Sequence, residues 1–132
     1  MNPYAAYKKQ SVTTMTPIEI VIKLYSETER ELNRSIVFIE EKNYESANNA
    51  LSKSVDLIAA LRSVLDVSLP IGKNLDAIYD FLEKQIITAN VKKDMEIVKS
   101  LLPMVAELKD AFTQIGAMSK DEIAAQSLQA SK

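Results

Sequence analysis

Helix-breaking residues are scarce in this chain, and their scarcity limits what it can fold into. Only 2 glycines and 4 prolines occur in 132 residues, whereas strong helix formers such as Ala, Leu, Glu and Lys are frequent. Apolar residues recur with helical spacing in four segments, at about 17–40, 44–66, 73–89 and 94–115. Because short connections favour antiparallel neighbours, we predict an all-α fold. It is an antiparallel up-down-up-down four-helix bundle with an N-terminal strap segment.

Polar residues that can cap a helix stand before three of these segments, at Thr16, Asn43 and Asp94. The first of them is the strongest start signal, since Pro17 fits the first helical position and Glu19 closes a capping box. Asn90 is expected to end the third helix. Residues 69–72, with the sequence Leu-Pro-Ile-Gly, are expected to break the chain before that helix.

Two tyrosines, Tyr4 and Tyr7, lie in a leader that lacks strong helix or strand periodicity. A free polar leader would not need paired aromatic rings, so we expect these rings to pack on the bundle. Both a permanent strap and a removable strap that a partner displaces would explain them. We therefore expect three parts in the chain, a strap at 1–15, the bundle at 16–116 and a flexible or weakly helical tail at 117–132.

The apolar stripes of two predicted helices are wider than four packed helices can cover. A bundle helix needs an apolar stripe of roughly 100°. A second apolar row flanks the main stripe in the second and fourth helices, at Ala50, Leu57 and Val64 and at Ile97, Met104 and Ala111. This surplus either widens the core or forms a groove for another apolar segment.

Composition excludes most catalytic and metal chemistry. The chain has no cysteine and no histidine, so it lacks disulfides, thiolate metal sites and an imidazole base. Carboxylates of the predicted helices fall largely on polar faces, and no glycine-rich loop could hold a phosphate. We expect no catalytic residues, no cofactor and no metal site.

Charge and hydropathy restrict the partners and the compartment. The 16 basic and 18 acidic residues are interspersed, which is not typical of a nucleic-acid-binding protein. No apolar run approaches the length of a membrane span, and no signal peptide opens the chain. We expect no nucleic-acid partner, no membrane insertion and a cytoplasmic location.

Several short motifs follow one another in a specific order over about residues 2–115. They are Asn2-Pro3-Tyr4-x-x-Tyr7, Thr16-Pro17-x-Glu19, Leu24-Tyr25, Leu57-Ile58-x-x-Leu61, Ile78-Tyr79-Asp80-Phe81-Leu82 and Leu108-Lys109-Asp110-Ala111-Phe112. In this order and spacing they resemble the FliS family, the flagellin-specific chaperones of bacterial flagellar export. The chain departs from the family pattern at Glu27, Pro103, Lys109 and Phe112.

The resemblance implies a bundle whose strap covers a hydrophobic surface. It also implies that this surface binds the disordered C-terminal segment of flagellin and that this binding prevents premature polymerisation of flagellin. The resemblance further implies that the complex docks on the flagellar export gate protein. From helical faces and family likeness, we expect Tyr4 and Tyr7 to compete with flagellin for a surface formed by Leu57, Ala60, Val64, Ile78, Phe81, Leu82 and Gln85. The alternative is a non-catalytic helical-bundle adaptor that self-associates through its apolar flanks.

Overall fold

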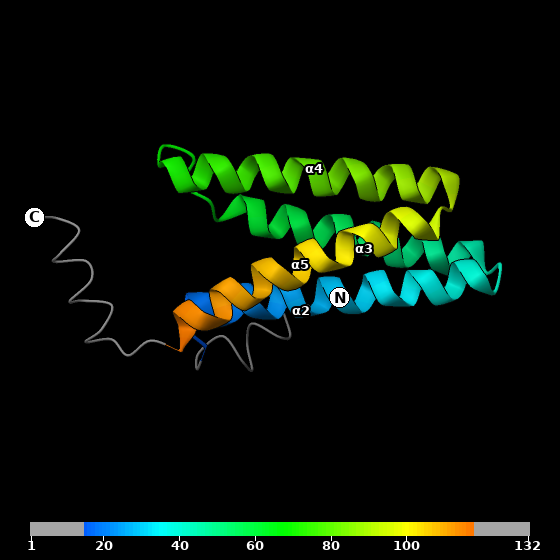
Figure 1. The fold of residues 1–132 in the computed structure, drawn as a ribbon, viewed down its shortest axis with the longest axis horizontal. Coiled ribbons are helices and arrows are strands. Elements are labelled where there is room, and N and C mark those ends of the chain that lie inside the picture. Colours follow the sequence, from blue (N-terminus) through cyan, green and yellow to red (C-terminus); the bar gives the residue numbers. More distant parts are fainter. Residues whose placement is uncertain (1–14, 118–132) are drawn as a thin grey trace, which may run out of the picture.

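The computed structural model describes residues 15–117, which form four α-helices and no strand. In chain order the helices are α2 (Pro17–Glu40), α3 (Tyr44–Ser63), α4 (Pro70–Lys92) and α5 (Met95–Gly116). Successive helices run in opposite directions and lie side by side (Figure 1). The predicted all-α, up-down-up-down four-helix bundle is confirmed in this part of the chain. The strap predicted at 1–15 and the tail predicted at 117–132 lie outside the described residues, apart from Met15 and Ala117.

Three helix starts are held by the side chains that the sequence predicts. The Thr16 hydroxyl oxygen accepts a hydrogen bond of 3.2 Å from the backbone N–H of Glu19. Asn43 and Asp94 accept equivalent bonds at the starts of α3 and α5, of 3.3 Å and 3.0 Å. These side chains satisfy backbone donors that have no partner inside the helix. All three predicted N-caps are confirmed.

The C-terminal end of α4 differs from the prediction. Asn90 does not end the helix, which continues to Lys92. The next residue, Lys93, adopts the left-handed conformation with φ 50° and terminates the helix there. The Lys93 ammonium donates to the backbone and side-chain oxygens of Asn90, at 2.5 Å and 2.6 Å. This lysine supplies the stop that the sequence pattern assigned to asparagine.

The connection between α3 and α4 also differs from the prediction at both of its ends. Helix α3 ends at Ser63, three residues before the expected boundary at Asp66. Residues 69–72 do not break the chain, because α4 begins at Pro70. Proline fits the first helical position, where the backbone N–H that it lacks has no partner inside the helix. The connection is therefore a short turn that leads directly into α4.

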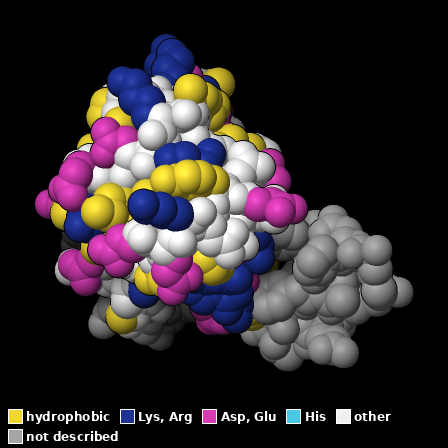
Figure 2. Space-filling view, turned by 90° about the vertical axis from the view of Figure 1, so that its right-hand side faces the viewer, with side chains coloured by type: hydrophobic (Ala, Val, Ile, Leu, Met, Phe, Trp, Pro, Cys, Tyr) yellow, Lys and Arg dark blue, Asp and Glu magenta, His cyan; other side chains and the backbone are white. Residues whose placement is uncertain are grey.

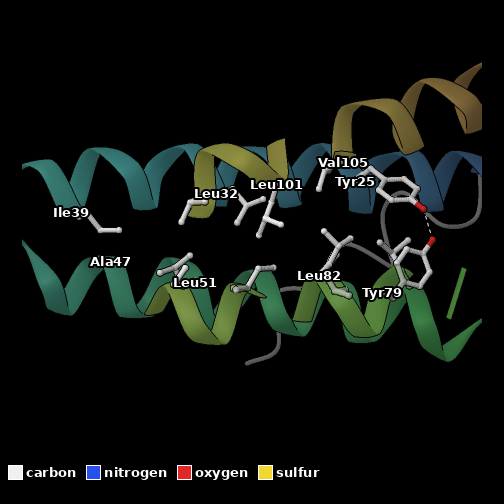
Figure 3. Close-up of a cluster of buried hydrophobic side chains, with 14 residues drawn as sticks. Tyr25, Leu32, Ile39, Ala47, Leu51, Tyr79, Leu82, Leu101 and Val105 are labelled. Carbon is white, nitrogen blue, oxygen red and sulfur yellow. Dashed lines mark hydrogen bonds between the residues drawn. The ribbon is translucent and has the colours of Figure 1, made fainter. Parts of the chain in front are cut away.

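One continuous apolar core joins all four helices (Figure 3). Its largest fully buried side chains include Tyr25, Leu32, Leu51, Ile58, Leu61, Tyr79, Leu82, Ile86 and Leu101. A buried carboxylate, Glu31, lies against this core. One of its oxygens is 3.0 Å from an Arg34 guanidinium nitrogen and 3.6 Å from the Lys53 ammonium nitrogen. These cations compensate the cost of burying the charge.

Helix α5 crosses the bundle obliquely, from the end of α4 to the beginning of α2 (Figure 1). It packs extensively on α2, whereas its contact with α4 is the slightest among the four neighbouring helix pairs. The apolar sides of α4 and α5 are therefore packed incompletely against each other. This packing is least complete where α5 lies farthest from α4, near the α3–α4 connection (Figure 1).

Candidate apolar binding groove

An apolar cavity of about 550 Å³ lies where the end of α3, the start of α4 and the end of α5 meet beside α2. Apart from Asp66 and the Tyr79 hydroxyl, its lining side chains are hydrocarbon. They include Val21, Leu61, Val64, Leu65, Leu69, Ile71, Leu75, Ile78, Leu108, Ala111, Phe112 and Ile115. We call this hollow the corner cavity.

Two further hollows, of about 410 Å³ and 360 Å³, continue from the corner cavity between α4 and α5. The residues that line them are Ala77, Ile78, Phe81, Met104, Glu107, Leu108 and Ala111. Because Ile78 lines all three hollows, they form one interhelical groove. Along α4 this groove extends from Ile71 to Phe81, about 15 Å at the rise of an α-helix, or about three turns.

Large apolar side chains along the groove are exposed to solvent. They are Val64, Leu69, Ile71, Phe81 and Ile115, with Val64 68% and Phe81 46% exposed. The end of the bundle away from the corner cavity shows acidic, basic and hydrophobic side chains interspersed (Figure 2). Exposed apolar side chains gathered along a groove are typical of a surface that binds a partner.

Three aromatic rings from three helices meet beneath the corner cavity. The hydroxyl groups of Tyr25 in α2 and Tyr79 in α4 point toward each other and form a hydrogen bond (Figure 3). The ring of Tyr25 also packs on that of Phe112 in α5, with centroids 5.6 Å apart. Burial raises the pKa of both phenols, so both remain protonated at neutral pH. The two tyrosines are buried in the core.

Gly72 allows the α3–α4 connection to lie directly against the start of α4. A Cβ atom at this position would stand 1.9 Å from the carbonyl oxygen of Asp66. That oxygen also accepts a hydrogen bond of 3.2 Å from the backbone N–H of Leu69. Because Gly72 has no side chain, the connection can approach α4 this closely. This close approach places Leu69 and Ile71 along the corner cavity.

Charged side chains fasten α3 to α4 beside the groove. The Arg62 guanidinium donates to Asp76 at 2.9 Å and to Glu83 at 3.3 Å, and lies 3.5 Å from Asp80. The hydrogen bond with Asp76 raises the pKa of Arg62, while a hydrogen bond from Lys84 lowers the pKa of Asp80. This network fixes α4 on α3 rather than on α5.

Residues at which the chain departs from the family pattern also lie at α5. The Lys109 ammonium nitrogen is 3.0 Å from a Glu29 carboxylate oxygen, which joins α5 to α2. Phe112 is part of the corner cavity, and α5 continues as a helix through Pro103. The Lys109–Glu29 ion pair and the packing of Phe112 on Tyr25 therefore join α5 to α2.

Three of the predicted binding residues lie along the groove. Val64 and Ile78 line the corner cavity, and Ile78 and Phe81 line its extension along α4. The predicted strap residues Tyr4 and Tyr7 lie outside the described part of the chain. From the predicted set, the structure therefore brings together two residues of α4 and Val64, which directly follows the last residue of α3.

The other predicted binding residues do not line the three hollows of the groove. Leu57 and Leu82 are fully buried between the helices, so a partner could reach them only after the helices move. Ala60 and Gln85 are partly buried. A binding role stays a prediction for these four residues, as it does for the three that lie along the groove.

Sequence reasoning did not assign the α5 side of the groove or the α3–α4 connection. Leu69 and Ile71, which line the corner cavity, fall in the segment expected only to break the chain. Leu108 and Ile115 come from α5. One signal was present, because Met104 and Ala111 widened the apolar stripe of the fourth predicted helix. It indicated surplus apolar surface without showing which helix would face it.

Two features are absent from the described part of the chain. Within residues 15–117, no three acidic side chains gather where they could hold a metal ion. None of α2 to α5 combines the length and apolar character that crossing a bilayer requires. The groove can bind an apolar segment by burial of its side chains.

Comparison with known proteins gives one consistent result. The family model described as Flagellar protein FliS matches residues 1–119. The Flagellar secretion chaperone FliS of Vibrio cholerae is 34% identical over 116 residues, which cover 83% of this chain and 85% of that protein. The protein of the same name from Bacillus subtilis is 29% identical over 113 residues, covering 86% and 85%. A structure described as a flagellar chaperone from bacteria has the same fold, with a TM-score of 0.71, 18% identity, and coverage of 85% of this chain and 93% of that one. The chain therefore belongs to the FliS family of flagellar secretion chaperones.

Proposed function

We propose that this protein is a non-catalytic, cytoplasmic flagellar secretion chaperone for flagellin. It binds the disordered C-terminal segment of flagellin in the interhelical groove, prevents premature polymerisation and delivers flagellin to the export gate protein. The observation that carries the proposal is an apolar groove, about three helical turns long, on a chain of the FliS family. Such a groove suits an amphipathic segment that becomes helical as it binds.

Burial of apolar surface is the proposed driving force. At about 25 cal/mol per Å², burying on the order of 1,000 Å² contributes roughly 25 kcal/mol before costs are subtracted. Ordering a disordered client and restricting its motion consume most of this free energy. The net affinity is then low enough for release at the export gate.

The leader is the proposed competitor for the groove. Val21, near the start of α2, lines the corner cavity, and Gly116 at the end of α5 lies close to Ile18. The chain before Pro17 therefore leaves the bundle beside the groove. Tyr4 and Tyr7 are within reach of it, because nine extended residues span about 30 Å. We propose that these rings cover the groove until flagellin displaces them.

Deletion of residues 1–14 tests the competing strap. If the leader occupies the groove, its removal raises the affinity for a flagellin C-terminal peptide, since the client no longer has to displace it. Circular dichroism of the shortened chain checks that the bundle remains folded. A loss of affinity in a folded variant would show that the leader contributes to binding, which contradicts competition.

Calorimetric titration of the full chain with a flagellin C-terminal peptide tests the groove itself. Phe81→Asp puts a charge on the groove, and we expect affinity to fall at least about tenfold. Ile87→Asp is the matched control, because Ile87 is 51% exposed on the same helix and lies outside the groove. Equal effects of the two substitutions, or no binding by the unmodified chain, would contradict the proposal.

Sedimentation distinguishes the chaperone from a self-associating adaptor. A chaperone forms a one-to-one complex with the flagellin peptide. An adaptor that uses the exposed apolar residues dimerises whether or not the peptide is present. Dimers of unmodified protein that Phe81→Asp abolishes, without peptide binding, would favour the adaptor.

A further inference from the structure

The hydrogen bond between Tyr25 and Tyr79 joins two helices that are not neighbours in the bundle. The neighbouring pairs are α2 with α3, α3 with α4, α2 with α5, and α4 with α5. Tyr25 belongs to α2 and Tyr79 to α4, so the bond crosses the bundle diagonally (Figure 3). Both side chains are at most 1% exposed. This bond is therefore an internal tie rather than a surface contact.

The tie lies where the position of α4 is otherwise weakly determined. Helix α4 is fastened to α3 through Arg62, but its packing on α5 is slight. Tyr79 lines the corner cavity, and Tyr25 packs on Phe112 of α5. Through these rings α4 is connected to the α2–α5 pair directly beneath the groove.

A hydrogen bond is suited to fix a spacing because it weakens steeply outside a narrow range of distance and angle. Apolar contacts tolerate sliding, since burial depends on area and not on direction. We propose that the Tyr25–Tyr79 hydrogen bond is a positioning contact that sets the spacing between α4 and α5, and with it the width of the interhelical groove. Its effect on binding rests on the proposed function, whereas its effect on the spacing does not.

A simpler role would be that each phenol only provides a hydrogen-bond partner for the buried hydroxyl group of the other. Replacement of one tyrosine by phenylalanine cannot separate the two roles, because it leaves the other hydroxyl buried without its partner. The double variant Tyr25→Phe with Tyr79→Phe removes both hydroxyls and leaves no unpaired group. The double variant therefore lacks the positioning contact, as the single variants do. Unlike them, it does not lose stability through an unpaired buried hydroxyl group.

Spin-label distances in the free protein test the spacing. The chain contains no cysteine, so Lys84→Cys in α4 and Ala106→Cys in α5, both exposed positions, can carry a unique pair of labels. We expect the distance distribution to broaden or shift in the single and double phenylalanine variants. Tyr44→Phe is the control and should leave it unchanged, because Tyr44 is half exposed at the start of α3. An unchanged distribution in the double variant would overturn the proposal.

Binding and stability, measured on the same variants, test the consequence for the groove. We expect the double variant to recover the urea midpoint lost in the single variants, yet to bind the flagellin C-terminal peptide about five- to tenfold more weakly than the unmodified chain. Recovery of both affinity and stability would mean that the pair only satisfies its own hydroxyls. If the unmodified chain does not bind the peptide, the proposed function fails, and the label distances still decide the role of the tie.

Discussion

Gly72→Ala should destabilise this protein, although the same change inside most helices is stabilising. Gly72 is the third residue of α4, and its added Cβ would lie 1.9 Å from the backbone oxygen and 2.6 Å from the backbone carbon of Asp66. Because both are main-chain atoms, no side-chain rotation can relieve the overlap. Either the α3–α4 connection or the first turn of α4 has to move.

The expected magnitude follows from two opposing effects. Overpacking at a site that cannot adjust costs about 3 kcal/mol, while alanine is favoured over glycine in a helix by about 1 kcal/mol. The net loss is about 2 kcal/mol, which lowers the urea midpoint by about 1 M at a slope of about 2 kcal/mol per M. Urea unfolding followed by circular dichroism measures it.

Gly116→Ala, at the other glycine of the chain, is the matched control. Its added Cβ would meet only side-chain atoms, at 2.8 Å from Ile18 Cγ2 and 3.3 Å from Ile22 Cδ1. Since the ends of these side chains can rotate, we expect a change within about 0.5 kcal/mol. A Gly72→Ala variant as stable as the unmodified chain would refute the close approach that the structure assigns to this position.

The remaining predictions concern charged groups. The hydrogen bond from Lys84 lowers the pKa of the Asp80 carboxyl group below 3.8 in the folded protein. This carboxylate therefore stabilises the fold above about pH 4. Its contribution is lost as the pH falls through the lowered pKa of the folded state. Asp80→Asn should therefore reduce the loss of stability below pH 4 in acid titration monitored by circular dichroism, and an unchanged profile would contradict this. Glu31→Gln should cost about 1–3 kcal/mol in urea unfolding, since it leaves cations without their buried partner. A neutral effect would show that the buried charge is not needed. Lys109→Met should cost less than about 1 kcal/mol, because its ion pair with Glu29 is partly exposed; the difference should shrink in high salt, and a salt-independent loss would point to packing instead.

Local features of this fold could be predicted because they depend on neighbouring residues. Thr16, Asn43 and Asp94 cap their helices through bonds to backbone groups two or three residues away, and no distant contact is needed to form them. Helix ends that depend on φ were harder to predict. Lys93 adopts a left-handed conformation that glycine or asparagine favours, so the stop was expected at Asn90 instead.

The residues that line the groove could not be predicted from the periodicity of single helices. Leu57 and Val64 are seven residues apart in the same apolar row of the second predicted helix, yet Leu57 is fully buried and Val64 is 68% exposed. Their predicted helical positions are equivalent, so periodicity cannot distinguish them. The difference arises because α3 ends at Ser63 and because α5 lies away from α4 at this end of the bundle.

The amino-acid sequence by itself determines that the chain forms amphipathic helices with defined starts. It also determines that these helices carry more apolar surface than four packed helices cover. Periodicity and capping specify these features because each is a relation between residues within a few turns. Only the tertiary structure decided which apolar side chains remain uncovered. That choice depends on the oblique path of α5 (Figure 1) and on the close approach at Gly72. Both bring together residues of different segments, which the pattern of a single helix cannot relate.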